Sequence, residues 1–226
     1  MADYHPAVEE YLETILELEE AGVPPMRARI VERLGVSAPA VSETVRRLER
    51  EGYLTLDDSR VMHLTASGRS YATSIMRRHR LAERLLVDVL KVPWHEVHAE
   101  AGRLEHAISD KLERHLVALL GDPATCPHGN PIPGSGNEGP DEQLTPLTAL
   151  GAGTTAVVRR IDEALEAQPG PMLLIEQAGL LPGTTVVSEG FGDGALMVRV
   201  AERRSALPRD IAALVYVAPP DGIARR

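Results

Sequence analysis

The fold of this chain is decided by residues 26–69, which read MRARIVERLGVSAPAVSETVRRLEREGYLTLDDSRVMHLTASGR. The first part predicts a short helix over residues 26–34, since apolar side chains such as Ile30 and Leu34 recur at helical spacing with arginines between them. Gly35 ends this helix, because glycine commonly follows the last helical residue. The stretch therefore opens with an amphipathic helix and a turn.

A second helix is predicted from Ser37 to Leu48. The Ser37 hydroxyl can accept an orphan backbone N–H, and Pro39 is tolerated in the first turn, where no intrahelical donor is yet needed. Val41, Val45 and Leu48 form one apolar stripe that we expect to be buried. The outward face then carries Ser42, Glu43, Arg46, Arg47 and Arg50.

A hairpin is predicted next along the chain. Residues 53–56 and 61–64 have the composition of strands, and Asp57-Asp58-Ser59-Arg60 forms a four-residue turn with Arg60 at its tip. Helix, turn, capped helix and hairpin in this order are typical of a winged helix-turn-helix, whose second helix enters the major groove of duplex DNA. The alternative interpretation is a solvated helical hairpin that binds no DNA.

The charge distribution supports the DNA-binding interpretation. The whole chain has a formal net charge of −9, yet residues 27–80 carry eleven arginines against six acidic residues. Residues 1–26 carry seven acidic residues and no lysine or arginine. A generally basic, sticky protein is therefore excluded, and the positive charge is confined to one module.

Length and composition set further limits. A chain of 226 residues can form two or three small domains. It has no apolar run near the roughly 20 residues that a membrane span needs, and residues 1–5 lack the features of a signal peptide, so we expect a cytoplasmic protein. The single cysteine, Cys126, excludes an intramolecular disulfide.

Helices are predicted on both sides of the winged helix. One acidic amphipathic helix covers residues 7–21, another covers 67–89, and a third covers 94–120 with an interruption near Ser109. The last two carry more apolar surface than they can cover by themselves, which predicts a homodimer interface suited to a palindromic operator. The alternative is an intramolecular helix bundle. The apolar positions are Leu81, Leu85, Leu86, Val89, Leu90, Leu104, Ile108, Leu112, Leu116 and Leu119.

The C-terminal part has a different composition. Residues 121–147 hold six prolines and five glycines, which predicts a linker without regular structure. A small β-barrel is predicted beyond it, from β-rich runs at residues 154–160, 184–188, 195–200 and 213–217 and a broken helical segment at residues 161–178. The fold class is thus mainly α with small β elements. The expected parts are a winged helix over 1–70, a helical metal-binding and dimerisation domain over 71–122, a linker over 123–148 and the β domain over 149–226.

Two of the predicted helices carry histidines and carboxylates on one face. Imidazole and carboxylate donors together suit Mn, Fe, Co, Ni and Zn. Each histidine taken singly is better explained as a surface or core-edge residue, whereas their joint placement on two helices supports a metal site as well as it supports that alternative. The positions are His79 and Glu83 on the first helix, and His98, Gly102, Glu105 and His106 on the second.

Five segments of the chain resemble the iron-dependent regulators typified by the diphtheria toxin repressor. The resemblance covers nearly the whole chain. It implies a dimeric transcriptional repressor, not an enzyme, that is activated by a divalent metal and binds double-stranded operator DNA. It also implies a winged helix, a helical dimerisation domain and an SH3-like C-terminal domain. The segments are residues 27–34, 37–48, 76–86, 105–110 and 129–134.

The resemblance implies a primary metal site formed by Glu10, Gly102, Glu105 and His106. Glu10 and Gly102 stand where iron-type members have methionine and cysteine, so the sulfur ligands are gone. Oxygen and nitrogen donors alone favour Mn²⁺ or Fe²⁺, with Co²⁺, Ni²⁺ and Zn²⁺ as alternatives in vitro. We expect the metal to bridge Glu10 to Glu105 and His106 and so hold the N-terminal helix in a DNA-binding conformation.

Two further sites are implied by the same resemblance. The ancillary metal site has matching residues at three positions, whereas its last two positions fall on Gln168 and Pro171, and proline supplies no side-chain donor. The matching ancillary residues are His79, Glu83 and His98. The anion-binding site corresponds to Arg80, Cys126 and Asn130.

The resemblance also completes the expected DNA-binding face. Glu43 stands where the family usually has a glutamine. Glutamine can pair with adenine, whereas glutamate can accept a hydrogen bond from cytosine N4. We therefore expect an operator that differs from the usual one of the family. The expected DNA-binding residues are Arg27, Ser37, Pro39, Ser42, Glu43, Thr44, Arg47, Arg50 and Arg60.

Two rival functions remain at this point. Gly102 and Pro171 suggest a winged-helix regulator that has lost metal control or responds to another ligand. A metalloenzyme is the other rival, because open His and carboxylate sites can activate water. The chain has no catalytic signature such as H-E-x-x-H, which disfavours the enzyme.

Overall fold

The computed structural model describes residues 6–136 and 143–220. It divides into two compact units: unit 1 is Met1–His79 with Arg103–Arg114, and unit 2 is Arg80–Gly102 with His115–Arg226. The expectation for residues 1–5 and the part of the expected linker at residues 137–142 lie outside the described residues. Among the helices that are described, none has both the length and the apolar character needed to cross a membrane.

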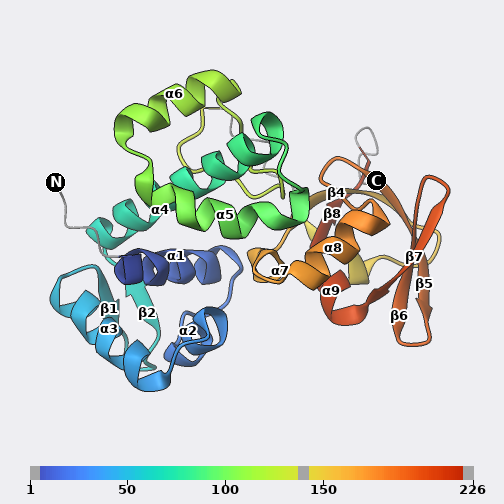
Figure 1. Ribbon diagram of the computed structural model, residues 1–226. Coiled ribbons are helices and arrows are strands. Elements are labelled where there is room, and N and C mark those ends of the chain that lie inside the picture. Colours follow the sequence, from blue (N-terminus) through green and yellow to red (C-terminus); the bar gives the residue numbers. More distant parts are fainter. Residues whose placement is uncertain (1–5, 137–142, 221–226) are drawn as a thin grey trace. The chain divides into compact units, whose positions relative to one another are not determined.

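Unit 1 contains the predicted winged helix-turn-helix (Figure 1). The helix α1 packs against α2 and β2, and its apolar face joins the core that α3 also covers. The core residues include Val8, Leu12, Ile15, Ile30, Val41, Val45, Leu48, Leu54, Met62, Ala72 and Met76. The elements are α1 (Pro6–Glu20), α2 (Arg27–Leu34), α3 (Ala38–Arg50), β1 (Leu54–Leu56) and β2 (Met62–Leu64).

Local interactions explain where these elements begin and end. Gly35 follows α2 with a left-handed φ of 64°, and its N–H donates to the Val31 carbonyl. The Ser37 hydroxyl accepts from the backbone N–H of Ala40 at 3.4 Å, so the predicted N-cap of α3 is confirmed. In the turn of the hairpin, a carboxylate oxygen of Asp57 accepts from the Val61 N–H at 2.9 Å.

Three helices each begin in one unit and end in the other. They are α4 (Ala66–Arg84), α5 (Val97–Leu104) and α6 (Asp110–Leu120). A π-helical turn at Leu85–Val89 continues α4, and the 3-10 turns Trp94–Glu96 and Glu105–Ala107 flank α5. The interruption expected near Ser109 is therefore present.

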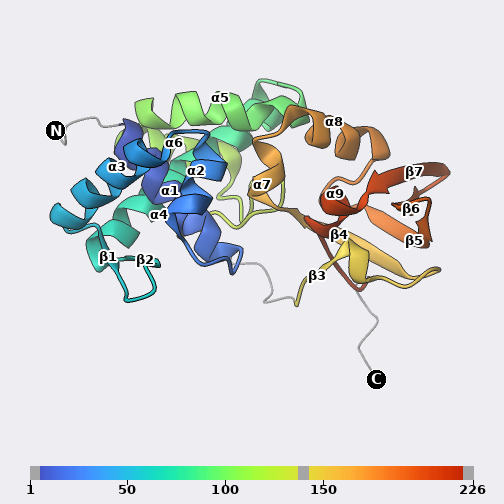
Figure 2. The same ribbon diagram turned by 90° about the horizontal axis from the view of Figure 1, so that it is seen from below.

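The C-terminal part of unit 2 is an antiparallel six-stranded sheet with the order β3-β8-β4-β5-β6-β7. The helices α8 and α9 lie beside the sheet (Figure 2). Their apolar side chains, such as Ile175 and Ile211, belong to the same buried core as those of the sheet. The bounds are β3 (Thr145–Pro146), β4 (Thr155–Ile161), α7 (Glu163–Glu166), α8 (Pro169–Ala178), β5 (Thr185–Gly192), β6 (Ala195–Val200), β7 (Arg203–Pro208), α9 (Arg209–Ala213) and β8 (Val215–Ala218), with a 3-10 turn at Leu147–Ala149.

The predicted C-terminal β domain is confirmed as an antiparallel sheet, and it differs from the prediction in two details. In the part of the chain that the structure describes, the edge strands β3 and β7 do not pair with each other, so the sheet is open. Strand β7 was absent from the predicted runs, because its sequence RRSALP has two arginines and a proline and lacks a run of β-branched residues. Antiparallel pairing with β6 along its whole length is what makes β7 a strand.

The expected linker is wrong for residues 121–136, which are packed into unit 2. Cys126 and His128 are fully buried, and the Cys126 N–H donates to the Asn130 carbonyl at 2.8 Å. At Gly129, which has a φ of +91°, an added Cβ would lie 2.0 Å from the Arg159 carbonyl oxygen, so only glycine permits this approach to β4. The prolines and glycines here shape a packed segment instead of a flexible one.

Candidate metal centre and DNA-binding face

A cluster of three buried donors lies in unit 1. Glu13 comes from α1, His79 from α4 and Glu105 from the 3-10 turn after α5, and their ligand atoms all lie within 4.8 Å of one another. The side chains of all three residues are less than a tenth exposed. His79 Nδ1 lies 2.5 Å from Glu105 Oε2. Three chain segments distant in sequence thus converge on one point.

His106 extends this cluster. Its Nδ1 lies 2.5 Å from Glu9 Oε2, and its Nε2 lies 3.4 Å from Glu105 Oε1. Glu9 also accepts from the Tyr71 hydroxyl at 2.6 Å, so its carboxylate is held at both oxygens. A carboxylate on one ring nitrogen of a histidine directs the other ring nitrogen toward a metal.

Glu10 is not among the donors that the structure brings together in this cluster. Its side chain is exposed, and its described hydrogen bond is made by the backbone carbonyl, which accepts from Thr14. The reason is helix phase: Glu9 and Glu13 are four residues apart and share one face of α1, whereas Glu10 is turned by about 100° from Glu9. Glu13 and Glu9 therefore take the place that was expected for Glu10.

The electrostatics of the cluster favour a cation. Burial and the neighbouring Glu105 carboxylate hold the pKa of Glu13 well above its ordinary value. Two buried carboxylates this close repel each other unless a proton or a cation lies between them. Carboxylate oxygens and imidazole nitrogens, without sulfur, fit divalent ions such as Mn²⁺ and Fe²⁺. The residues present therefore fit a divalent metal.

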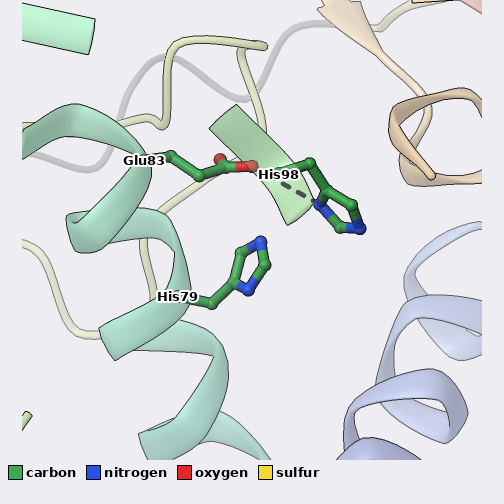
Figure 3. A group of neighbouring side chains, drawn as sticks. All are labelled: His79, Glu83 and His98. Carbon is green, nitrogen blue, oxygen red and sulfur yellow. Dashed lines mark ion pairs between the residues drawn. The ribbon is translucent and has the colours of Figure 1, made fainter. Parts of the chain in front are cut away.

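The remaining expected ligands belong to unit 2, apart from His79, which is the last residue of α4 in unit 1. Those in unit 2 are Glu83, His98, Gly102 and Gln168. Gly102 is in α5 and offers only a backbone carbonyl. Figure 3 shows Glu83 one turn after His79 on α4 and facing His98, with 3.5 Å between Glu83 Oε1 and His98 Nδ1. The pairing of Glu83 with His98 is thus present in the structure.

Gln168 does not reach this region with its side chain. It is exposed, and its amide Nε2 donates to the Ala164 carbonyl at 2.7 Å. The short helix α7 ends at Glu166, and Gln168 stands at the N-cap position of α8, where its side chain caps no backbone N–H and instead folds back on the chain. The buried carboxylate of Glu166 takes the place expected for Gln168, and its Oε2 lies 3.5 Å from His98 Nδ1.

Two of the three residues expected to bind an anion are paired with carboxylates of the chain itself. Arg80 is fully buried, and its guanidinium donates to both carboxylate oxygens of Glu163 at 2.9 and 3.0 Å. Asn130 donates to Glu166 and to the Ile161 carbonyl. Burial, and then the nearby Glu83, raise the pKa of the Cys126 thiol to about 12. Arg80 and Asn130, which were expected to bind an anion, are therefore each paired with a carboxylate of the chain, Glu163 and Glu166 respectively.

The expected DNA-binding residues lie on one exposed module of unit 1. Ser37, Pro39, Glu43 and Arg50 are exposed on α3 or its cap, and Arg60 is exposed at the tip of the hairpin. Ser42, Thr44 and Arg47 are half-buried on the same helix, and Arg27 is half-buried on α2. Arg46, which was on the predicted outward face, lines a depression together with Arg27 and Arg60.

Four site residues were missed by the sequence reasoning. Glu9 and Glu13 had a usable signal, namely their four-residue spacing on a helix with a well-defined apolar face. His128 and Glu166 had none, because one lies in a segment expected to be a linker and the other in a four-residue helix. Their positions depend on tertiary packing.

Part of the expected dimer surface is exposed in the single chain. In unit 2 the exposed large apolar side chains include Val89, Leu90 and Leu119, which are 46%, 59% and 63% exposed. Leu81, Ile108 and Leu116 from the same prediction are buried within the chain. Val89, Leu90 and Leu119 are thus the members of the expected dimer surface in unit 2 that the single chain leaves exposed.

Three family models match successive parts of the chain. Residues 3–61 match the N-terminal DNA binding domain of iron dependent repressors, and residues 65–134 match their metal binding and dimerisation domain. Residues 145–219 match the FeoA domain.

Whole-chain relatives agree with these matches. The iron-dependent repressor IdeR of Mycobacterium tuberculosis is 45% identical over 219 residues, which cover 92% of this chain and 95% of the relative. The diphtheria toxin repressor of Corynebacterium efficiens is 40% identical over 99% of this chain and 100% of its own. The solved structure of a manganese-dependent transcriptional repressor in complex with manganese has a TM-score of 0.82 and 32% identity, covering 94% of this chain and 99% of its own.

Proposed function

We propose, from the premise that this chain belongs to the iron-dependent repressor family, that it represses transcription by binding operator DNA as a homodimer loaded with a divalent metal. The family consists of transcriptional repressors and not of enzymes. Its DNA-binding and dimerisation models both match this chain. We place its action in the cytoplasm, where operator DNA is found.

The observation that carries this proposal is the buried cluster of Glu13, His79 and Glu105 in unit 1. Two carboxylates in a nearly water-free site are costly by themselves, and a divalent ion offsets their charge. His106 and its orienting partner Glu9 supply a further imidazole. The all-oxygen-and-nitrogen donor set favours Mn²⁺ or Fe²⁺.

The cluster can control DNA binding because its residues sit on the elements that carry the winged helix. Glu9 and Glu13 belong to α1, which packs against α2 and β2. When Glu13, His79 and Glu105 share one ion, α1 is fixed to α4 and to the turn after α5. The DNA-competent orientation of α3 is then favoured, provided that the ion binds this state more tightly than the others.

The operator is expected to be palindromic. Two copies of α3 related by two-fold symmetry would enter major grooves one helical turn or a multiple apart. Glu43 is exposed on α3, and its carboxylate can only accept hydrogen bonds. A base contact by Glu43 would therefore favour cytosine, whose N4 amino group donates in the major groove. Arg60 at the hairpin tip and Arg27 on α2 are suited to phosphate contacts.

The proposal is tested by metal titration of operator binding with two matched variants of α1. Glu13→Gln removes a buried carboxylate, so the metal concentration needed for half-maximal DNA binding should rise by at least about 10-fold. Glu10→Gln changes an exposed carboxylate on the same helix and should leave that concentration unchanged. Equal metal dependence of the two variants would reject the cluster as the sensor, and operator binding that ignores metal in the wild type would favour a metal-independent regulator.

A further inference from the structure

Tyr71 joins the metal cluster of unit 1 to the base of the hairpin. It is half-buried on α4, the helix that also carries His79. Its hydroxyl donates to Glu9 Oε1 at 2.6 Å, and the other oxygen of the same carboxylate, Glu9 Oε2, lies 2.5 Å from His106 Nδ1. One carboxylate of α1 therefore bridges a histidine beside the cluster and a tyrosine outside it.

The hydrogen bond between Tyr71 and Glu9 is of the strong, charge-assisted kind. Its length of 2.6 Å lies in the range of a hydroxyl that donates to an ionised carboxylate. Burial, and then the bond to Glu9, raise the pKa of the Tyr71 hydroxyl far above its ordinary value, so the hydroxyl keeps its proton near neutral pH. Tyr71 is thus a permanent donor to Glu9.

The ring of Tyr71 also packs on the ring of Tyr53, with 5.7 Å between the ring centroids and an angle of 51° between the planes. Tyr53 lies between the end of α3 and the start of β1. Its N–H donates to the Leu48 carbonyl of α3 at 2.9 Å, and its carbonyl accepts from the Thr65 N–H at 3.0 Å, just after β2. Tyr53 therefore ties the last turn of α3 to both strands of the hairpin.

The first turn of α4 lies directly on the backbone of Tyr53. A Cβ added at Gly68 would lie 1.8 Å from the Tyr53 carbonyl oxygen, so the two backbones are in close contact. The Thr65 hydroxyl fastens the same region, because it donates to the Gly52 carbonyl at 2.7 Å. Close-packed atoms transmit a displacement because they cannot be compressed. A shift of α4 therefore moves Tyr53.

We propose that Tyr71 is a positioning residue that couples the metal cluster to α3 and the hairpin, an inference that rests on the function proposed above. A histidine that ligates through one ring nitrogen donates from the other, so the ligating state of His106 fixes Glu9. Glu9 then holds the Tyr71 hydroxyl, and the Tyr71 ring holds Tyr53. The coupling requires that this hydrogen bond be stronger in the DNA-competent state than in the other state.

The test measures the coupling between metal and DNA in both directions with the full-length protein. Operator affinity is measured with and without saturating Mn²⁺, and Mn²⁺ affinity with and without operator; anaerobic Fe²⁺ is the second probe. Tyr71→Phe loses the hydroxyl and keeps the ring, so both affinity ratios should fall by one common factor, at least about 5-fold. Tyr53→Phe removes the other hydroxyl of the ring pair and should leave both ratios unchanged.

A hydrogen bond with a merely structural role would give a different result. It would be equally strong in both states, so Tyr71→Phe would lower the melting temperature and keep both ratios at the wild-type values. That result would overturn the assignment, and so would an equal fall of the ratios in Tyr53→Phe. If neither ion changes operator binding by the wild type, the proposed function fails and the assignment falls with it. A wild type and a Tyr71→Phe variant that respond equally reject the role of Tyr71 alone.

Discussion

At the scale of single residues, the chemistry of this protein depends on which carboxylates are buried. Glu105, His106 and His79 were expected from spacing and resemblance, and the structure brings all three into one part of unit 1. Glu10 was expected beside them, but helix phase exposes it and turns Glu13 inward. The types of donor in the cluster were therefore predictable from the sequence. Which carboxylate of α1 faces the cluster was not, because this helix carries acidic residues on several faces.

The burial of Glu13 predicts a pH effect in the metal-stripped protein. Its pKa is raised in the folded state by burial and by Glu105, so the native state binds more protons than the unfolded one. The stabilising contribution of Glu13 is then fully present below the pKa of an unfolded glutamate, about 4.3. This contribution is lost as the pH rises through the raised pKa of Glu13 in the folded state. Glu13→Gln should reduce the loss of the free energy of unfolding with rising pH, and it should make the metal-stripped protein more stable at pH 7. Urea unfolding at pH 5 and pH 7 measures it; a wild type and a variant with identical pH slopes would contradict it.

The buried pair of Arg80 and Glu163 predicts a large stability loss on truncation. Arg80→Met leaves the Glu163 carboxylate buried without its guanidinium, which should cost about 3–5 kcal/mol in the free energy of unfolding. Adding Glu163→Gln to the Arg80→Met variant should restore part of the lost free energy of unfolding. The control Arg199→Met breaks a partly exposed pair with Glu189 and should cost about 1 kcal/mol or less. Similar losses for the two single variants in urea unfolding would refute the reasoning.

At the scale of elements, the winged helix was the most predictable part. Its helices have clear apolar stripes, and local residues such as Ser37 and Gly35 fix their ends. The packed segment 121–136 was not predictable, because its proline and glycine content is shared with linkers and only tertiary contacts order it. Strand β7 was missed for the same reason, since pairing with β6 and not its own composition makes it a strand.

The tip of the hairpin gives a test that separates folding from DNA binding. Arg60 has a left-handed φ of 65°, a conformation that glycine adopts without strain. Arg60→Gly should therefore keep or slightly raise the melting temperature, while it weakens DNA binding by removing a phosphate contact. The slope of log K against log salt should fall by about 1. An unchanged slope would show that the hairpin tip does not contact phosphate.

At the scale of the whole molecule, the single chain leaves apolar side chains exposed, and we propose that the homodimer covers them. Leu90 and Leu119 are more than half exposed in unit 2. Composition indicated this surplus of apolar residues, but the sequence could not separate residues buried within the chain, such as Leu81, from those left for a partner. That distinction requires the packed structure.

A single substitution tests the dimer surface. Leu119→Glu places a charge where a second copy is expected, so the dimer dissociation constant should rise by at least about 10-fold. Leu173→Glu on α8 alters another exposed leucine outside the predicted surface and should leave the dimer intact. Sedimentation velocity over a range of concentrations distinguishes the two. Equal dissociation constants for both variants would place the interface elsewhere.

The measurement that tests the central claim most directly is operator binding by the metal-stripped wild type, followed by fluorescence anisotropy at fixed salt. A selected palindromic operator is titrated with protein alone and then with Mn²⁺, Fe²⁺, Co²⁺ or Zn²⁺. We predict that Mn²⁺ or Fe²⁺ tightens binding by roughly 5–150-fold, the usual range for coupling between two sites. Equal affinity with and without every metal would contradict the account, because the buried cluster of Glu13, His79 and Glu105 would then not control DNA binding.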